Sequence, residues 1–279
     1  MVSYILHNDN FYESTAAVVA ANNRGFKFGD GIFESMRYCN GKLQFAVHHA
    51  DRLKAGMKAL KMDGYALMDD YFLKQKVSEL LKKNKFKGDV RFRLTIYRDG
   101  EGLYTPQQNK VGYVLEGMEM AQKGYELNQK GLIISVYDEL TKPINKLSNF
   151  KTNNALLYVM AGLYQKQHRL DEAMILNQNG FLCESTTSNV FVVYQKQIYT
   201  PALSEGCVAG VMRTVILQLT KTHGIPLIEA QISPEILNEA EEVFVTNASS
   251  GIRWVMGYGR KRYFNEVAKL LSAKLNELV

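Results

Sequence analysis

The spacing of hydrophobic and polar positions predicts a chain that mixes β-strands with amphipathic helices. Residues 48–60 repeat their apolar positions at helical spacing, so that one face of a helix is apolar. Residues 69–83 show the same helical period, and either Asp69 or Asp70 suits the N-terminal cap of this predicted helix. Alternating stretches predict strands at residues 4–12 and 15–20, around a turn at 8–10, and at residues 89–100 and 111–120.

The second half of the chain continues this mixture after a break in the pattern. Residues 117–130 lose their periodicity and turn polar, which predicts an interdomain connection at 121–130. We therefore expect a smaller N-terminal α/β domain over residues 1–120 and a larger C-terminal domain over 131–279. Strands are predicted at residues 132–140, 172–177, 189–200 and 241–248, and helices from Lys151 through Tyr164, at 210–222 and at 265–278. The fold class is α+β (mixed α/β), since the spacing is too irregular for a simple doubly wound sheet.

Composition narrows the classes of function. The 279 residues are 46% hydrophobic, and the formal charge is +6 from 34 basic and 28 acidic residues. The basic residues are spread along the chain, which argues against nucleic-acid binding and favours an anionic small molecule. No apolar run is long enough for a membrane span, and the N-terminus does not resemble a signal peptide, so we expect a cytoplasmic protein. Three cysteines and five histidines lack the spacing of a disulfide framework or metal site.

Five short segments end a predicted strand or open a helix with small and polar residues: 27–37, 149–154, 183–189, 206–213 and 245–251. The segment GCVAGVMR could present backbone amides to an anion at a helix N-terminus, although a tight turn is the simpler explanation of this segment by itself. In CESTTSN, Glu184 stands beside hydroxyl residues, either in a solvated turn or as a carboxylate that pairs with a cation. The glycines of residues 25–31 do not form a dinucleotide-binding fingerprint.

Lys151 lies at a predicted strand-to-helix junction, in SNFKTNNALLYV. A helix N-terminus disfavours a cation, so this position is poor for an ordinary charged lysine. Such a position, with partial burial, would lower the pKa of a lysine and make its amine nucleophilic. Lys151 is therefore either a solvated surface cation or a catalytic amine.

Four segments and the central Lys151, taken in their order along the chain, resemble the fold-type IV pyridoxal-phosphate enzymes. The segments are RGFKFGDGIFESMR before Lys151, and GFLCESTTSNVFVV, CVAGVMR and EVFVTNASSGI after it. These are the class IV aminotransferases, which include branched-chain aminotransferases, D-amino-acid aminotransferases and aminodeoxychorismate lyases. The resemblance extends from Asn22 to about Val255. It implies a two-domain fold with the active site between the domains and with the C-terminal domain, 131–279, binding the cofactor. It also implies pyridoxal 5'-phosphate as that cofactor, a small amino-acid or oxo-acid substrate, and a homodimer.

The resemblance also implies a role for each matching residue. Lys151 would form the aldimine with the cofactor and move a proton at the substrate's Cα. Glu184 would pair with the protonated pyridine nitrogen. Other cofactor-binding positions are Arg52, Val211 and Met212 (through their backbone amides), Asn247 and Ala248 at the phosphate, and Ser188 and Asn189 at the ring. Positions that face the substrate in relatives are Phe33, Arg37, Arg93 and Arg98.

Two positions depart from the transaminase pattern. Met212 and Ala248 replace the hydroxyl residues usual in branched-chain and D-amino-acid transaminases, and in this they resemble the lyases. GIFESMR, in contrast, resembles the branched-chain transaminases. We therefore expect amino-group transfer through a Lys aldimine and a Cα carbanion. The alternatives are a lyase that releases pyruvate and p-aminobenzoate, and a non-enzymatic binding protein on the same scaffold.

Overall fold

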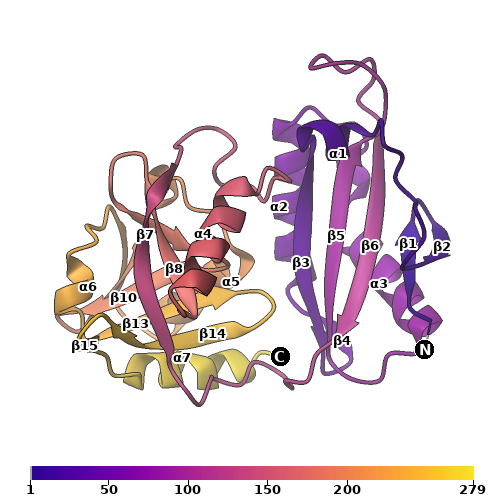
Figure 1. Ribbon diagram of the computed structural model, residues 1–279. Helices are drawn as coiled ribbons and strands as arrows, with labels where there is room; N and C mark the ends of the chain where they lie inside the picture. The colour runs from indigo at the N-terminus through magenta and orange to yellow at the C-terminus, as the bar shows by residue number, and fades with distance from the viewer. Residues whose placement is uncertain (1) are drawn as a thin grey trace. The chain divides into compact units, whose positions relative to one another are not determined.

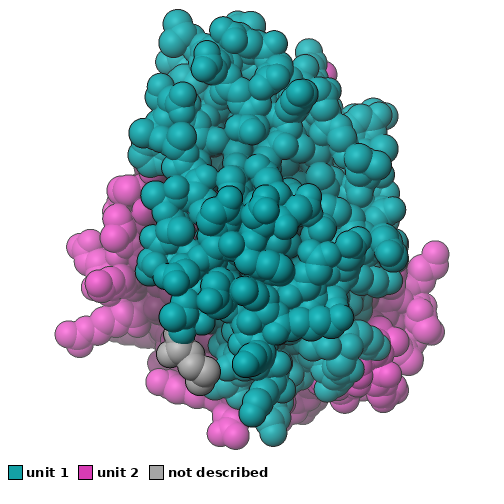
Figure 2. Space-filling model, turned by 90° about the vertical axis from the view of Figure 1, so that its right-hand side faces the viewer, with its two compact units in different colours: residues 1–124, 150–154 teal, residues 125–149, 155–279 magenta. Residues whose placement is uncertain are grey.

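A computed structural model describes residues 2–279, which divide into two compact units (Figures 1 and 2). Unit 1 comprises residues 1–124 together with 150–154, and unit 2 comprises 125–149 and 155–279. The main division therefore falls within the predicted connection. The short segment 150–154, which carries Lys151, groups with unit 1 although the sequence-based division assigned it to the C-terminal domain.

Unit 1 is built on a six-stranded antiparallel sheet in the order β2-β1-β6-β5-β3-β4. The long central strands β3 and β5 pair along eight residue positions, from Gly31 opposite Tyr97 to Tyr38 opposite Val90. The strands are β1 Tyr4–His7, β2 Asn10–Glu13, β3 Gly31–Cys39, β4 Lys42–Leu43, β5 Val90–Arg98 and β6 Val111–Glu119. The helices are α1 Arg24–Phe28, α2 Ala46–Ala59 and α3 Asp70–Asn84, with a 3₁₀ turn at Tyr65–Leu67.

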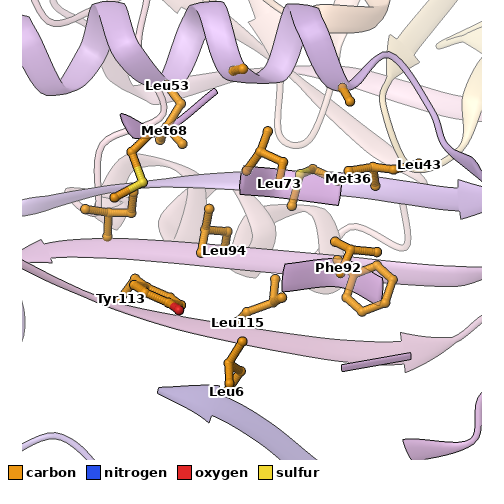
Figure 3. Packing of buried hydrophobic residues seen from close by; sticks show 14 of the residues in the cluster. Leu6, Met36, Leu43, Leu53, Met68, Leu73, Phe92, Leu94, Tyr113 and Leu115 are labelled. Atoms are coloured by element: carbon orange, nitrogen blue, oxygen red, sulfur yellow. The ribbon is translucent and has the colours of Figure 1, made fainter. Parts of the chain in front are cut away.

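The core of unit 1 lies between one face of this sheet and helices α2 and α3. Side chains alternate between the two faces of a strand, so β5 directs Phe92 and Leu94 into the core, where they meet Leu53 of α2 and Leu73 of α3 (Figure 3). The intervening positions of β3 and β5, such as Phe33 and Arg93, therefore stand on the opposite face of the sheet.

Unit 2 is built on a nine-stranded mixed sheet in the order β12-β11-β10-β13-β14-β7-β8-β9, with β15 paired to β14. Three pairings are parallel, namely β7 with β8, β7 with β14, and β11 with β12. The strands are β7 Leu132–Lys142, β8 Glu172–Asn177, β9 Leu182–Ser185, β10 Asn189–Tyr194, β11 Gln197–Pro201, β12 Leu227–Ala230, β13 Glu242–Asn247, β14 Gly251–Tyr258 and β15 Lys261–Arg262. The helices are α4 Leu156–Gln167, α5 Val211–Thr222, α6 Ile236–Glu239 and α7 Glu266–Asn276, with a 3₁₀ turn at Leu203–Glu205.

Strands β8, β10 and β13 of unit 2 are buried almost throughout, which explains their nearly continuous apolar runs. Val190, Val192, Val243 and Val245 belong to one core cluster. The alternate positions Phe191 and Phe244 stack with their ring centroids 5.0 Å apart. Helix α4 covers β7 and β8 through a separate small cluster that includes Tyr137, Ala161, Ala173 and Ile175. Unit 2 thus buries both faces of its sheet.

The mixed α/β class is confirmed, and so are most of the elements. The side chain of Asp69 caps α3, and its carboxylate accepts a hydrogen bond from the Phe72 amide at 2.8 Å. Two strand predictions were wrong. Residues 15–20 form turns, because their mostly exposed side chains have no sheet face to bury. Residues 189–200 form two strands, β10 and β11, because Gln195 and Lys196 adopt positive φ and turn the chain into a hairpin.

Among residues 2–279, every helix is too short or too polar to cross a membrane. The same residues contain no group of three or more His, Cys, Asp or Glu side chains arranged to hold a metal ion.

Candidate functional site

Lys151 is held by the backbone of β3. The Phe33 amide donates to the Lys151 carbonyl at 2.8 Å, and the Asn153 amide donates to the Gly31 carbonyl at 2.9 Å. This pairing needs glycine at 31, because a Cβ there would lie 2.3 Å from Nδ2 of Asn153. Helix α4 begins only at Leu156, so Lys151 is not at the helix N-terminus that the sequence predicted. Its position is set by the sheet of unit 1 instead.

The side chain of Lys151 lies against the ring of Phe33. Its Nζ is 4.6 Å from the ring centroid, and the guanidinium carbon of Arg93 is 3.7 Å from the same centroid. Burial lowers the pKa of Arg93, with the charge of Glu116 on the neighbouring strand acting in the opposite direction. The structure thus brings three predicted site residues together on the face of the sheet away from the core.

Arg37 and Arg98 occupy different surroundings. Arg37 is fully buried and donates from Nη2 to Asp89 and to the Gln122 carbonyl, each at 2.7 Å. Arg98 is also buried, and its guanidinium binds Asp30 at 2.9 Å and the Leu60 carbonyl at 2.6 Å. The prediction that these arginines face a substrate does not fit such burial and pairing. Their contacts stabilise loops at the ends of β3 and β5.

Arg52 projects from α2 toward Glu34 of β3. Its Nε and Nη2 donate to Oε1 and Oε2 of Glu34 at 2.8 and 2.6 Å, and Nδ1 of His49 lies 2.6 Å from Oε2. Burial raises the pKa of Glu34, but the charge of Arg52 and the bond to His49 outweigh it and bring the pKa to about 2. Burial lowers the pKa of His49. The predicted phosphate-binding arginine is therefore fixed in place by a bidentate ion pair.

Glu184 of β9 is buried in unit 2 with an exposed fraction of 3%. Its Oε1 accepts from Nζ of Lys142 at 2.5 Å and from the Tyr158 hydroxyl at 2.6 Å, and its Oε2 accepts from the Val208 amide at 2.8 Å. Burial and the charge of Glu184 raise the pKa of Tyr158. Sequence reasoning missed Lys142 and Tyr158. The available signal was a lysine at the end of β7, which does not reveal a partner 42 residues away.

Helix α5 begins beside this carboxylate. Its N-cap is Gly210, and no side chain of the described residues caps the first turn. The amides of Val211 and Met212 therefore have no acceptor within the helix, as is usual at a helix N-terminus. Asn189 donates from Nδ2 to the Val208 carbonyl at 2.8 Å. A Cβ at Gly210 would lie 1.9 Å from Oδ1 of Asn189, so the loop can approach this closely only with glycine. Asn189 therefore holds the loop that leads into α5.

The turn after β13 is organised by the side chain of Asn247. Oδ1 of Asn247 accepts from the amides of Ser249 and Ser250 at 3.0 and 2.8 Å, while its Nδ2 donates to Oγ of Ser188 at 3.0 Å. The Ala248 carbonyl accepts from the Tyr125 hydroxyl at 3.0 Å. Both side-chain ends of Asn247 are thus used to hold the turn in shape.

Ser188 connects this turn to a buried acid on β8. Its Oγ lies 3.3 Å from the Thr187 hydroxyl, which donates to Glu172 at 2.5 Å. Burial raises the pKa of Glu172, while its bonds to Thr187 and Ser185 lower it. In unit 2 the structure therefore joins Ser188 to Asn247, and it joins Glu184 and Asn189 to the loop that precedes α5.

The family model for amino-transferase class IV matches residues 31–257, which is most of the chain. The chain belongs to the class IV aminotransferase family. The match spans both units and includes every predicted site residue, from Phe33 to Ala248.

Individual relatives agree with this membership. A protein of Methanocaldococcus jannaschii named "Putative branched-chain-amino-acid aminotransferase" is 27% identical over 271 residues, covering 97% of this chain and 93% of the relative. A D-alanine aminotransferase of Listeria innocua is 28% identical over 250 residues, covering 88% and 84%. The structure of a branched-chain aminotransferase from Thermobaculum terrenum in its PLP form has a TM-score of 0.86 at 20% identity, covering 99% and 94%. The last match concerns the fold alone.

Proposed function

We propose that this class IV family member is a pyridoxal-phosphate enzyme that transfers an amino group between a small amino acid and a 2-oxo acid. One observation carries the proposal. The loop Val208–Gly210 joins a buried carboxylate, Glu184, to the uncapped N-terminus of α5. A ligand that carries both a ring cation and a phosphate needs such a pair of groups at a fixed separation.

The residues fit this cofactor. The uncapped N-terminus of α5 presents the amides of Val211 and Met212 to an anion, and the turn at Asn247 and Ala248 contributes more polar groups. Arg52 is a further candidate for the phosphate, because its ion pair with Glu34 holds the guanidinium in one orientation. Bound pyridoxal phosphate supplies an aldehyde for an amine and an electron-withdrawing ring that stabilises negative charge at a substrate's Cα.

The remaining roles follow from the chain's own groups. Lys151 would provide the amine and would hold or move the proton at the substrate's Cα. Glu184 would accept a hydrogen bond from the ring nitrogen and favour its protonated form. Arg93, a partly buried cation on Phe33, is suited to bind a substrate carboxylate.

The first experiment tests the lysine. Purified protein loaded with pyridoxal phosphate should absorb visible light, and borohydride should remove the band and leave the cofactor's mass on a peptide that contains Lys151. Lys151→Ala should lose the band and the activity, whereas Lys146→Ala, at an exposed neighbour, should keep both. A Lys151→Ala protein with full activity would remove the assignment.

The second experiment separates the two chemistries. Formation of glutamate from 2-oxoglutarate and a panel of L- and D-amino acids supports the aminotransferase. Met212 and Ala248 favour the alternative, the aminodeoxychorismate lyase, and release of pyruvate and p-aminobenzoate would support it. A protein that binds pyridoxal phosphate but catalyses neither reaction would favour a binding protein on this scaffold.

A homodimer forms part of the proposal, and helix α4 supports it. Leu156, Val159, Met160 and Leu163 follow helical spacing and are 77, 53, 38 and 56% exposed. A continuous apolar stripe on one helix is typical of an interaction surface. The protein should elute at twice its 31.7 kDa, and the pair Leu156→Glu with Leu163→Glu should reduce it to a monomer. Leu67→Glu, an exposed leucine away from the stripe, is the control.

A further inference from the structure

Lys142 is a buried cation that the proposed function leaves without a role. It ends β7 with an exposed fraction of 5%, and its Nζ contacts Oε1 of Glu184 at 2.5 Å. A buried ion pair costs desolvation of both charges, so it needs good geometry and further hydrogen bonds to persist. The Tyr158 hydroxyl supplies one such bond to the same oxygen at 2.6 Å, and its ring lies 5.7 Å from Nζ of Lys142.

The two oxygens of Glu184 have different partners. A carboxylate oxygen accepts about two hydrogen bonds. Oε1 receives two donors, Lys142 and Tyr158, whereas Oε2 receives one, the Val208 amide, among the described residues. Oε2 is therefore the oxygen with room for another donor, and it is the oxygen bonded to the loop that leads into α5.

Other ionisable groups around Glu184 do not replace Lys142. Cys183 and Cys207 lie beside it, and burial raises the pKa of both thiols, that of Cys207 to about 11. Glu205 and Arg213 act on Cys183 and Cys207 respectively. Lys142 is thus the cation in direct contact with the carboxylate.

We propose that Lys142 is a positioning residue that keeps Glu184 ionised, so that the proton shared between Glu184 and the cofactor's ring nitrogen stays on the nitrogen. This inference rests on the proposed function, in which the ring nitrogen binds Glu184. Tyr158 assists by holding Oε1 and thereby fixing which oxygen receives the ring.

The direction of the effect follows from distance. The ammonium of Lys142 contacts Oε1, so it is nearer to the carboxylate than to any donor bound at Oε2. Moving the shared proton from Glu184 to the nitrogen moves positive charge away from Lys142, which Coulomb repulsion favours. Without Lys142, burial favours a neutral carboxyl group and the proton moves back toward Glu184.

Two spectroscopic measurements test this separately from activity. In the protein without cofactor, infrared spectroscopy with ¹³C-labelled glutamate reports whether Glu184 is protonated, when Glu184→Gln is subtracted. In the loaded protein, NMR of cofactor labelled with ¹⁵N at the ring reports the fraction of nitrogen that carries the proton. Both are measured on the full chain, together with cofactor affinity.

The variants separate charge from hydrogen bonding. Lys142→Met should give a protonated-carboxyl band and a decreased fraction of protonated ring nitrogen. Lys142→Arg should give the wild-type result in both measurements. Tyr158→Phe should leave the charge of Lys142 in place, and it should therefore change both signals less than Lys142→Met does. Lys166→Met, at an exposed position of α4, should match the wild type. If Lys142→Met does not fold, the double variant with Glu184→Gln should recover the fold, because no buried charge is left unpaired.

Each outcome is decisive. An unchanged ¹⁵N signal in Lys142→Met, with no protonated carboxyl, overturns the inference. Failure of Lys142→Arg to restore the signals also counts against it, because it would point to packing rather than charge. If the wild-type protein binds no pyridoxal phosphate, the proposed function fails. The infrared measurement then still decides whether Lys142 keeps Glu184 ionised.

Discussion

Each unit contains a buried carboxylate that is paired with a cation, and the two cations bind their carboxylates in different ways. Glu34 and Glu184 are 2 and 3% exposed, and each accepts three hydrogen bonds. The guanidinium of Arg52 spans both oxygens of Glu34, whereas Lys142 contacts one oxygen of Glu184. The two donors of a guanidinium fix both oxygens of a carboxylate. The ammonium of Lys142 fixes one oxygen of Glu184 and leaves the other to the Val208 amide.

The largest expected effect separates the pairs by stability. Glu34→Gln removes the carboxylate that faces the guanidinium of Arg52, whose side chain is 9% exposed and cannot lose its proton, and should cost about 3–5 kcal/mol of unfolding free energy. Glu184→Gln should cost less, because an unpaired lysine can become neutral. Denaturant unfolding of both variants measures the difference. Glu139→Gln, at an exposed position, serves as the control. Equal losses in the two buried variants would contradict the comparison.

A pH series tests the Glu34 pair without removing it. The fold lowers the pKa of Glu34 from 4.5 to about 2, so this carboxylate stabilises the fold at pH values above 4.5. That contribution is on the order of 3 kcal/mol and is lost as the pH falls through 2. The unfolding free energy, measured from pH 5 downward, should decrease accordingly. The decrease should be smaller in Glu34→Gln, and identical slopes would argue against a perturbed Glu34.

The smallest expected change in unfolding free energy comes from replacing the guanidinium of the Glu34 pair by an ammonium, as in the Glu184 pair. Arg52→Lys keeps the charge but loses the second donor to Glu34, and should cost about 1–3 kcal/mol. The unfolding free energy is measured without cofactor, so that any role of Arg52 at a phosphate does not contribute. Arg91→Lys, at an exposed position of β5, should change little. An unchanged unfolding free energy in Arg52→Lys would mean that bidentate pairing with Glu34 does not stabilise the fold more than a single contact does.

The sequence predicted what local patterns encode. Helix α3 and its Asp69 cap, and the hairpin of β1 and β2, follow from periodicity and turn chemistry. The family resemblance supplied the membership that the family model confirms. The hairpin at Gln195 and Lys196 was missed, because neither residue is a usual positive-φ residue.

Long-range pairing limited the prediction of the site. The apolar helix after Lys151 suggested a helix N-terminus at the lysine, yet the lysine's backbone pairs with Phe33, far away in sequence. Arg37 and Arg98 occupy plausible strand positions, and their burial depends on Asp89 and Asp30. The contact of Lys142 with Glu184 likewise appears only when β7 and β9 fold together. The roles of the individual site residues stay predictions until the variants are made.

The five residues 150–154 have a consequence for dividing the protein into parts. They lie in the second half of the sequence but complete the hydrogen bonding of Gly31 and Phe33 in unit 1. A fragment that stops at Gly124 would leave those groups without partners, and the complementary fragment would carry the catalytic candidate Lys151 away from β3. Recombination between relatives at residue 124 would therefore have to exchange β3 and residues 150–154 together, so the two units are not separately transferable modules.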